Sequence, residues 1–340
     1  MPALPPLSQS IPPTLPSAGS GSLHNLPGQE SPFGAALEPV LAGACDGRLS
    51  AITWFRTTWQ RGGAATGYAT FRDDHGIDQP VVVKLPVPPI ERFWLLHLTR
   101  YSDIVPRVYA QGETLNGYDL AWVVMERLPH GPLGSAWNGA EFDLLTQAAA
   151  RFHAAAAEVP ITGQAPHPER DWKAILDTAR RNITRDHDVR NEQRWKNALK
   201  TAHKKLRDWM KIWNDRPRDQ WCHGDLHLGN AMTRVPAPDG PALLLDFAQV
   251  HAGFWVEDAV YFEHLYWARR QKLRGRRLCS MIAHERKALG LHAEPDWPRL
   301  ASVKRALLAM STPAMLQADG DPHHVDAALE VLEIELNQAH

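Results

Sequence analysis

The sequence reads His223-Gly-Asp-Leu-His-Leu-Gly-Asn230 and then, after a turn rich in proline, Ala242-Leu-Leu-Leu-Asp-Phe247. The residues between these stretches suit a hairpin, because Ala231–Val235 can form a strand and Pro236–Pro241 has the composition of a turn. The second strand of the hairpin is then the apolar run that ends at a carboxylate. This arrangement predicts that two polar side chains meet where the hairpin opens.

Those two side chains are Asn230 and Asp246, which would lie side by side at the open end of the hairpin. One amide oxygen and one carboxylate are hard ligands of the kind that Mg²⁺ prefers. Asp225 precedes Asn230 on the loop that enters the hairpin, where its carboxylate could accept a proton from an incoming hydroxyl. The spacing therefore predicts a magnesium site beside a candidate catalytic aspartate.

The rest of the chain divides into a strand-rich part and a helical part. β-branched and aromatic residues gather, with turns between them, in the segments 49–59, 66–72, 81–85 and 121–125. A helix is expected to open near Ile90, after a proline-rich stretch. Beyond about residue 128 apolar residues recur at helical spacing, as in the stripe Trp195, Leu199, Ala202, Leu206, Trp209 and Trp213. Strands followed by helices predict an α+β fold rather than a doubly wound sheet.

These motifs resemble the aminoglycoside phosphotransferase and choline kinase family, which is related to the protein kinases. The spacing from Asp225 to Asn230 is that of the kinase catalytic loop, and Asp246 stands where kinases have the aspartate of Asp-Phe-Gly. His223 and His227 fit the His-Gly-Asp-x-His form of the small-molecule branch, and Asp258 resembles the later aspartate that braces the loop. The resemblance assigns Asp225 as the catalytic residue, Asn230 and Asp246 as metal ligands, and the other three as supporting residues.

The resemblance implies a protein-kinase-like bilobal fold with a small antiparallel β N-lobe and a larger, mainly helical C-lobe. It covers roughly residues 48–340 and gives three expected regions. These are a disordered tail rich in proline and serine over residues 1–33, a nucleotide-binding N-lobe over 34–127, and a catalytic and substrate-binding C-lobe over 128–340. The expected activity is transfer of the γ-phosphate of ATP to a hydroxyl of a small molecule, with Mg²⁺ as the metal.

Further residues are expected to contact the nucleotide. Lys84, inside the apolar run 81–85, would orient the ATP phosphates, and Glu91 is the acid available to pair with it. Gly62 and Gly63 could form the loop over the phosphates, although glycines in a hairpin turn are equally common without that role. The remaining two, Glu126 and Leu128, lie in the segment that resembles the hinge meeting adenine.

Composition excludes several other classes of protein. The chain has 340 residues, of which 44% are hydrophobic and 22% charged, with 37 basic and 38 acidic side chains. A net charge of −1 gives no general attraction to nucleic acid or to anionic membranes, so neither partner is expected. No apolar run is long enough to span a membrane. Three widely spaced cysteines argue against a disulfide framework, and a cytoplasmic location is expected.

The acceptor is the open question, because the region that should bind it, roughly 256–340, carries patches of both signs. The basic stretch 269–277 has charge on every side of a helix, so much of it must face solvent. Asp326 and Glu330 instead share one face of an amphipathic helix, opposite its apolar face. This acidic face favours a cationic acceptor such as an aminoglycoside, amino sugar or amino alcohol, whereas a basic wall would suit a carboxylated or phosphorylated metabolite.

Two hypotheses from other classes are weaker. A metal-dependent hydrolase could use His223, Asp225 and His227 as ligands. That hypothesis leaves Lys84, Asn230 and Asp246 without a role. A non-catalytic pseudokinase is disfavoured because the candidate base, both metal ligands and the strand lysine are all present. Stimulation by ATP with Mg²⁺ rather than Zn²⁺ would separate a kinase from the hydrolase.

Overall fold

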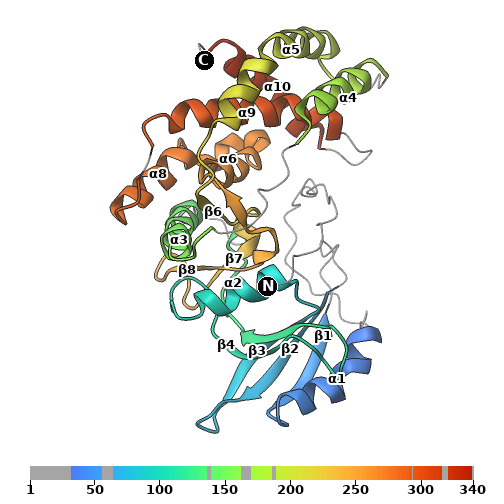
Figure 1. Ribbon diagram of the computed structural model, residues 1–340, viewed down its shortest axis with the longest axis vertical. Helices are drawn as coiled ribbons and strands as arrows, with labels where there is room; N and C mark the ends of the chain where they lie inside the picture. The colour runs from blue at the N-terminus through green and yellow to red at the C-terminus, as the bar shows by residue number, and fades with distance from the viewer. Residues whose placement is uncertain are drawn as a thin grey trace.

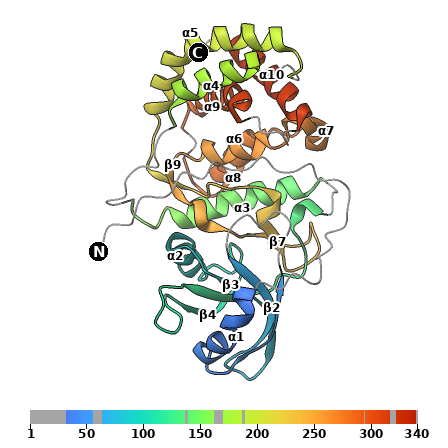
Figure 2. The same ribbon diagram turned by 90° about the vertical axis from the view of Figure 1, so that its right-hand side faces the viewer.

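The computed structural model describes residues 32–55, 64–135, 139–161, 170–185, 189–292, 294–315 and 321–338. Two lobes follow one another along the longest axis of the molecule, with the sheet at one end and most helices toward the other (Figure 1). The smaller lobe carries the N-terminal strands and the larger one carries the helices that follow, as the view turned by 90° also shows (Figure 2). No helix of the described residues is both long enough and apolar enough to cross a membrane.

The small lobe is built on a five-stranded sheet in the order β1-β2-β3-β5-β4, in which every neighbouring pair is antiparallel. Its strands are β1 (Leu49–Phe55), β2 (Ala65–Arg72), β3 (Asp78–Leu85), β4 (Val108–Gly112) and β5 (Trp122–Glu126). Val81, Val83 and Leu85 alternate with less buried neighbours along β3, which gives the sheet one apolar face. The predicted strands are confirmed where the structure describes them, and β4 is an additional strand.

A helix that the sequence did not predict covers this sheet. α1 (Pro32–Ala44) begins within the stretch assigned to the disordered tail, and it packs against β1 and β2. Leu41 and the following Cys45 are buried with Leu49 and Phe71 in the core of the small lobe. The tertiary contact stabilises a segment whose own composition gave no helical signal.

α2 (Pro89–Leu98) joins the small lobe to the larger core, and its position near residue 90 matches the prediction. A proline opens the helix, where a missing N–H costs nothing. Trp94 is fully buried, with its ring 5.9 Å from Phe152 and 5.0 Å from Trp221 of the large lobe. The helix that carries Glu91 is therefore fixed against the same core that supports the loop over residues 223–230.

The large lobe contains eight α-helices among the described residues. They are α3 (Glu141–Ala156), α4 (Trp172–Arg185), α5 (Glu192–Asn214), α6 (Val256–His264), α7 (Arg270–Leu273), α8 (Leu278–Ala288), α9 (Trp297–Ser311) and α10 (Pro322–Leu336). The predicted apolar stripe of α5 is buried throughout, from Trp195 to Trp213. Two short antiparallel pairs lie nearer the small lobe: β6 (Gln220–Cys222) with β9 (His251–Gly253), and β7 (Ala231–Thr233) with β8 (Ala242–Leu244).

Candidate active site

The predicted hairpin between the two motif stretches is present. β7 pairs with β8 so that Ala231 faces Leu244, and the Leu245 N–H continues the pairing by donating to the Asn230 carbonyl over 2.9 Å. Asn230 and Asp246 therefore leave adjacent positions at the open end of the hairpin, as the sequence predicted. Both side chains offer oxygen atoms at that end, which is the donor set that Mg²⁺ requires.

The backbone at Asp246 has a conformation that few residues adopt. Its φ of 61° lies in the left-handed region, which aspartate tolerates better than most side chains. The side chain is 45% exposed, so its carboxylate is accessible to a ligand. Since non-glycine residues in this region cluster at functional sites, the strain is consistent with a binding role for this carboxylate.

Lys84 reaches the same place from β3. Its Nζ donates to both carboxylate oxygens of Glu91, over 2.6 and 2.9 Å, and lies 3.6 Å from Asp246 Oδ1. The geometry thus pairs Lys84 with Glu91, the acid that the sequence singled out. Burial by itself lowers the pKa of Lys84, but the carboxylates of Glu91 and Asp246 outweigh burial and raise that pKa, so the ammonium keeps its charge.

Asp225 has hydrogen-bond donors on both of its carboxylate oxygens. The Asn230 amide donates to Oδ2 over 3.0 Å and also to the Asp225 carbonyl, and the Tyr261 hydroxyl donates to Oδ1 over 2.6 Å. His227 Nε2 lies 3.6 Å from Oδ2. Burial alone would raise the pKa of Asp225, but His227 and Tyr261 lower it to about 2. The Asp225 carboxylate is therefore ionised and is a weak base. It can accept a hydrogen bond from a hydroxyl more readily than it can deprotonate that hydroxyl before the reaction begins.

Asp258, on α6, holds the backbone of the catalytic loop. Its buried carboxylate accepts the N–H of His223 over 2.7 Å and that of Gly224 over 2.8 Å, and His153 Nε2 lies 3.1 Å away. Burial would raise the pKa of Asp258, but His153 and these hydrogen bonds lower it. The loop is thus fixed to a helix of the large lobe by a buried, ionised side chain.

The two histidines of the motif each bind backbone. His223 Nε2 bonds with the Leu245 carbonyl over 3.1 Å, and its Nδ1 accepts the Asp225 N–H over 3.3 Å. Both nitrogens of His223 are occupied, so it cannot complete the three-ligand metal set of the hydrolase hypothesis. His227 Nδ1 accepts the Gly229 N–H over 3.0 Å, which orders the turn before Asn230.

Gly224 is required by both conformation and space. Its φ is +81°, and a Cβ added there would lie 2.2 Å from the Gln249 carbonyl oxygen. We expect Gly224→Ala to lower the free energy of unfolding by more than about 2 kcal/mol and to reduce activity, because the loop must move. Gly290→Ala is the matched control, since Gly290 has a φ of +74° with nothing within 4 Å of the added atom. Equal melting temperatures for the two variants would contradict the predicted clash.

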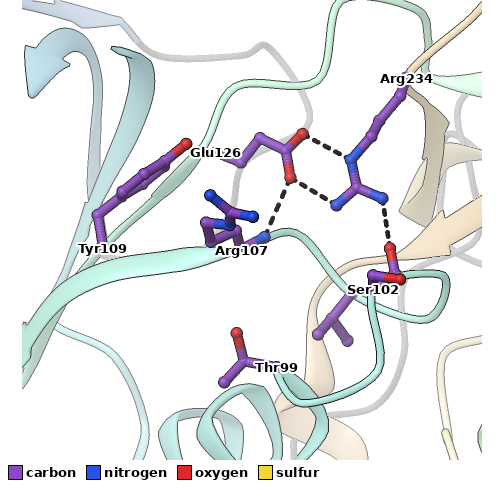
Figure 3. Close-up of a pocket in the computed structure, with 7 residues that line it drawn as sticks. Thr99, Ser102, Arg107, Tyr109, Glu126 and Arg234 are labelled. Carbon is purple, nitrogen blue, oxygen red and sulfur yellow. Dashed lines mark hydrogen bonds and ion pairs between the residues drawn. The ribbon is translucent and has the colours of Figure 1, made fainter. Parts of the chain in front are cut away.

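Glu126 is the last residue of β5, the strand that resembles the hinge, and its side chain forms an ion pair with Arg234. The carboxylate accepts two hydrogen bonds of 2.7 Å from the Arg234 guanidinium and one of 3.1 Å from the Arg107 N–H (Figure 3). These groups line a cavity of about 440 Å³ together with Thr99, Ser102, Val105 and Tyr109. The carboxylate thus joins the small lobe to the segment after β7, and the Glu126 N–H donates to the Arg107 carbonyl over 2.8 Å. The expectation that Glu126 meets adenine stays a prediction.

Of the three other residues that are expected to contact the nucleotide, the structure describes one, Leu128. Leu128 follows β5 and is buried, and its expected contact with the nucleotide stays a prediction. Gly62 and Gly63 lie outside the described residues. Their expected place over the phosphates stays a prediction.

Asp326 and Glu330, on the acidic face of α10, both have polar or basic neighbours. Asp326 accepts a hydrogen bond of 3.1 Å from Asn191 and lies 3.8 Å from an Arg190 nitrogen, while Glu330 lies 3.7 Å from Arg270. In both ribbon views α10 lies in the part of the large lobe remote from the five-stranded sheet (Figures 1 and 2). Neighbouring arginines thus share this face with any ligand, and its role in binding the acceptor stays a prediction.

Sequence reasoning missed the tyrosine that contacts the catalytic candidate. Tyr261 follows Asp258 by three residues on α6, so both side chains lie on one face of the helix. That spacing was the available signal, because a helix that braces the loop at one position must also face it one turn later. Arg234 was missed as well, since nothing in the sequence near it indicates its partner Glu126.

The site brings together the Lys84 ammonium, the Asp225 carboxylate and the two candidate metal ligands, Asn230 and Asp246. Lys84 contacts Asp246, Asp246 follows the residue paired with Asn230, and Asn230 donates to Asp225. A site of this kind can hold a polyphosphate through the ammonium and a metal, and present a carboxylate to a hydroxyl. This is the set of groups that phosphoryl transfer needs.

Comparison with known proteins agrees with this chemistry. The family model described as the phosphotransferase enzyme family matches residues 65–302. No curated protein sequence matches the chain.

Solved structures share the two-lobed fold. The GDP complex of wild-type aminoglycoside 2′-phosphotransferase-IIIa has a TM-score of 0.53 at 14% identity, over 91% of this chain and 99% of that chain. A Ralstonia eutropha protein described as an aminoglycoside phosphotransferase gives 0.53 at 15% identity, over 88% and 97%. The microcompartment-associated aminopropanol kinase gives 0.50 at 13% identity, over 84% and 90%. At such low identity the likeness concerns the fold, and it confirms the predicted α+β, protein-kinase-like architecture.

Proposed function

This chain belongs to the phosphotransferase enzyme family, and from that premise we propose that it transfers the γ-phosphate of ATP, with Mg²⁺, to a hydroxyl of a small molecule. The observation that carries the proposal is that Lys84 lies 3.6 Å from Asp246 beside the hairpin end where Asn230 donates to Asp225. The Leu245 N–H, just before Asp246, donates to the Asn230 carbonyl and fixes that end. Lys84 of the small lobe thus meets three residues of the loop and hairpin in the order in which a nucleotide, a metal and an acceptor would lie.

The residues at the open end of the hairpin fit the proposed metal. Asn230 and Asp246 would hold Mg²⁺, since they offer an amide oxygen and an accessible carboxylate from adjacent positions. When bound, the ion would neutralise charge on the phosphate oxygens. Lys84 would hold the phosphates beside it, kept charged and oriented by Glu91.

Asp225 would bind the acceptor hydroxyl and orient it toward the phosphate. Its pKa of about 2 makes it a weak base, which suits a reaction in which proton removal lags behind bond cleavage. The rate enhancement would then come mainly from positioning and from charge neutralisation. The proton of the hydroxyl would pass to Asp225 as the new P–O bond completes.

The acceptor remains to be identified within the class of small hydroxyl compounds. An amino-sugar or amino-alcohol acceptor was expected from Asp326 and Glu330, but both carboxylates have arginine partners. A carboxylated or phosphorylated acceptor is the alternative, and the test must include both classes.

A coupled assay of ADP release tests the proposal. The chain would be incubated with Mg·ATP and a panel of amino sugars, amino alcohols, hydroxy acids and phosphorylated sugars. We expect release that depends on one class of acceptor and on Mg²⁺, with a phosphorylated product visible by mass spectrometry. If Zn²⁺ stimulates the release of ADP and no phosphate passes from ATP to an acceptor, the result would instead support a hydrolase.

A further inference from the structure

Tyr261 makes a shorter hydrogen bond to the candidate catalytic carboxylate than Asn230 does. Its hydroxyl donates to Asp225 Oδ1 over 2.6 Å, whereas the Asn230 amide donates to Oδ2 over 3.0 Å. Each oxygen thus has its own donor, and the two donors come from different elements, α6 and the turn before β7. A carboxylate held at both oxygens cannot rotate about its Cβ–Cγ bond without breaking a hydrogen bond.

The helix that carries Tyr261 is rigidly placed. Its neighbours Ala259, Val260 and Phe262 are fully buried in the core of the large lobe. One turn earlier, Asp258 binds the backbone N–H groups of the catalytic loop. The same helix therefore fixes the backbone of the loop at one position and the side chain of Asp225 at another.

The Tyr261 hydroxyl is suited to remain a hydrogen-bond donor to Asp225. Burial raises the pKa of Tyr261, and the charge of Asp225 raises it further, so the hydroxyl keeps its proton near neutral pH. Asp225 is partly exposed, with 28% of its side chain accessible. A carboxylate oxygen has two lone pairs, so Oδ1 can accept a hydroxyl from an acceptor while it stays bound to Tyr261.

We propose that Tyr261 is a positioning residue that sets the orientation of the Asp225 carboxylate toward the acceptor hydroxyl. This inference rests on the proposed function and adds a residue to it. Tyr261 is assigned no role toward the nucleotide phosphates, and it does not supply the catalytic group. It acts by holding one oxygen in place, and phosphoryl transfer is sensitive to such placement because the nucleophile must lie in line with the leaving group.

Tyr261→Phe removes only the hydroxyl and keeps the ring. We expect kcat to fall by about 10- to 100-fold, because the carboxylate is free to rotate, while the KM of ATP and the melting temperature change little. Tyr266→Phe is the matched control, since Tyr266 lies just beyond the same helix and packs on Phe142 and Phe262. This control should retain the kcat of the unmodified chain.

A double-mutant cycle separates positioning from a structural role. If Tyr261 acts through Asp225, then Tyr261→Phe should add no further loss to Asp225→Asn, whereas an independent structural effect would add its own. Full activity of Tyr261→Phe, or additive losses in the double variant, would overturn this inference and leave the proposed function standing. An unmodified chain that transfers phosphate to no acceptor would overturn both.

Discussion

Asp225→Asn is expected to lower kcat for phosphoryl transfer by about 1,000-fold or more, the scale of loss when an essential catalytic group is removed. The amide cannot accept a proton, and it replaces the anion that Tyr261 and Asn230 orient. The affinity for Mg·ATP should stay within about threefold, since the interactions proposed for the nucleotide come from Lys84 and Asp246. Single-turnover transfer and equilibrium titration with a fluorescent ATP analogue would measure the two effects separately.

Asp239→Asn is the matched control for this charge change. Asp239 is exposed in the turn of the same hairpin, where it makes a backbone turn contact with Pro236. The control variant should keep both transfer and nucleotide affinity. A Asp225→Asn variant that loses ATP binding while remaining folded would show that Asp225 belongs to the nucleotide site, which would refute its assignment to the acceptor.

Asp246→Ala is expected to weaken ATP binding in the presence of Mg²⁺ by about 100-fold or more, because a charged ligand of the proposed metal is lost. Binding of ATP without metal should change far less, since Lys84 and Glu91 remain paired. Calorimetric titrations with and without Mg²⁺ give the comparison directly. Mg²⁺ should therefore increase the ATP affinity of Asp246→Ala much less than it increases that of the unmodified chain.

The backbone at Asp246 calls for a second variant. A left-handed φ of 61° is more strained for alanine than for aspartate or asparagine, so Asp246→Asn removes the charge at lower conformational cost. Both variants should lose metal-dependent affinity, and Asp246→Asn should melt at the higher temperature of the two. Normal Mg·ATP binding by Asp246→Asn would mean that the metal site is not at the open end of the hairpin.

Local chemistry made much of the catalytic centre predictable. The turn residues 236–241 between two short apolar runs produce the hairpin, and its pairing places Asn230 next to Asp246 by register alone. Lys84 and Glu91 are separated by a strand end and one proline-opened turn, so few arrangements could keep them apart. In each case the partners are close in sequence, and the chain has little freedom to place them elsewhere.

Contacts between distant segments were not predictable in the same way. The bond from Tyr261 to Asp225, the pairing of Glu126 with Arg234 and the contact of Asp326 with Asn191 each join elements whose relative placement depends on the whole core. α1 became a helix because an apolar surface of the sheet was available to it.

The sequence by itself therefore determined the local geometry of the loop and hairpin, because backbone pairing and turn chemistry act over a few residues. It also determined the amphipathic faces of the helices, and with them the α+β class. Only the tertiary structure decided which partner each charged face met, because an ion pair forms wherever packing of the apolar faces brings opposite charges together. Asp326 and Glu330 illustrate the difference, since their spacing defined a face and the packing of α10 gave that face to arginines.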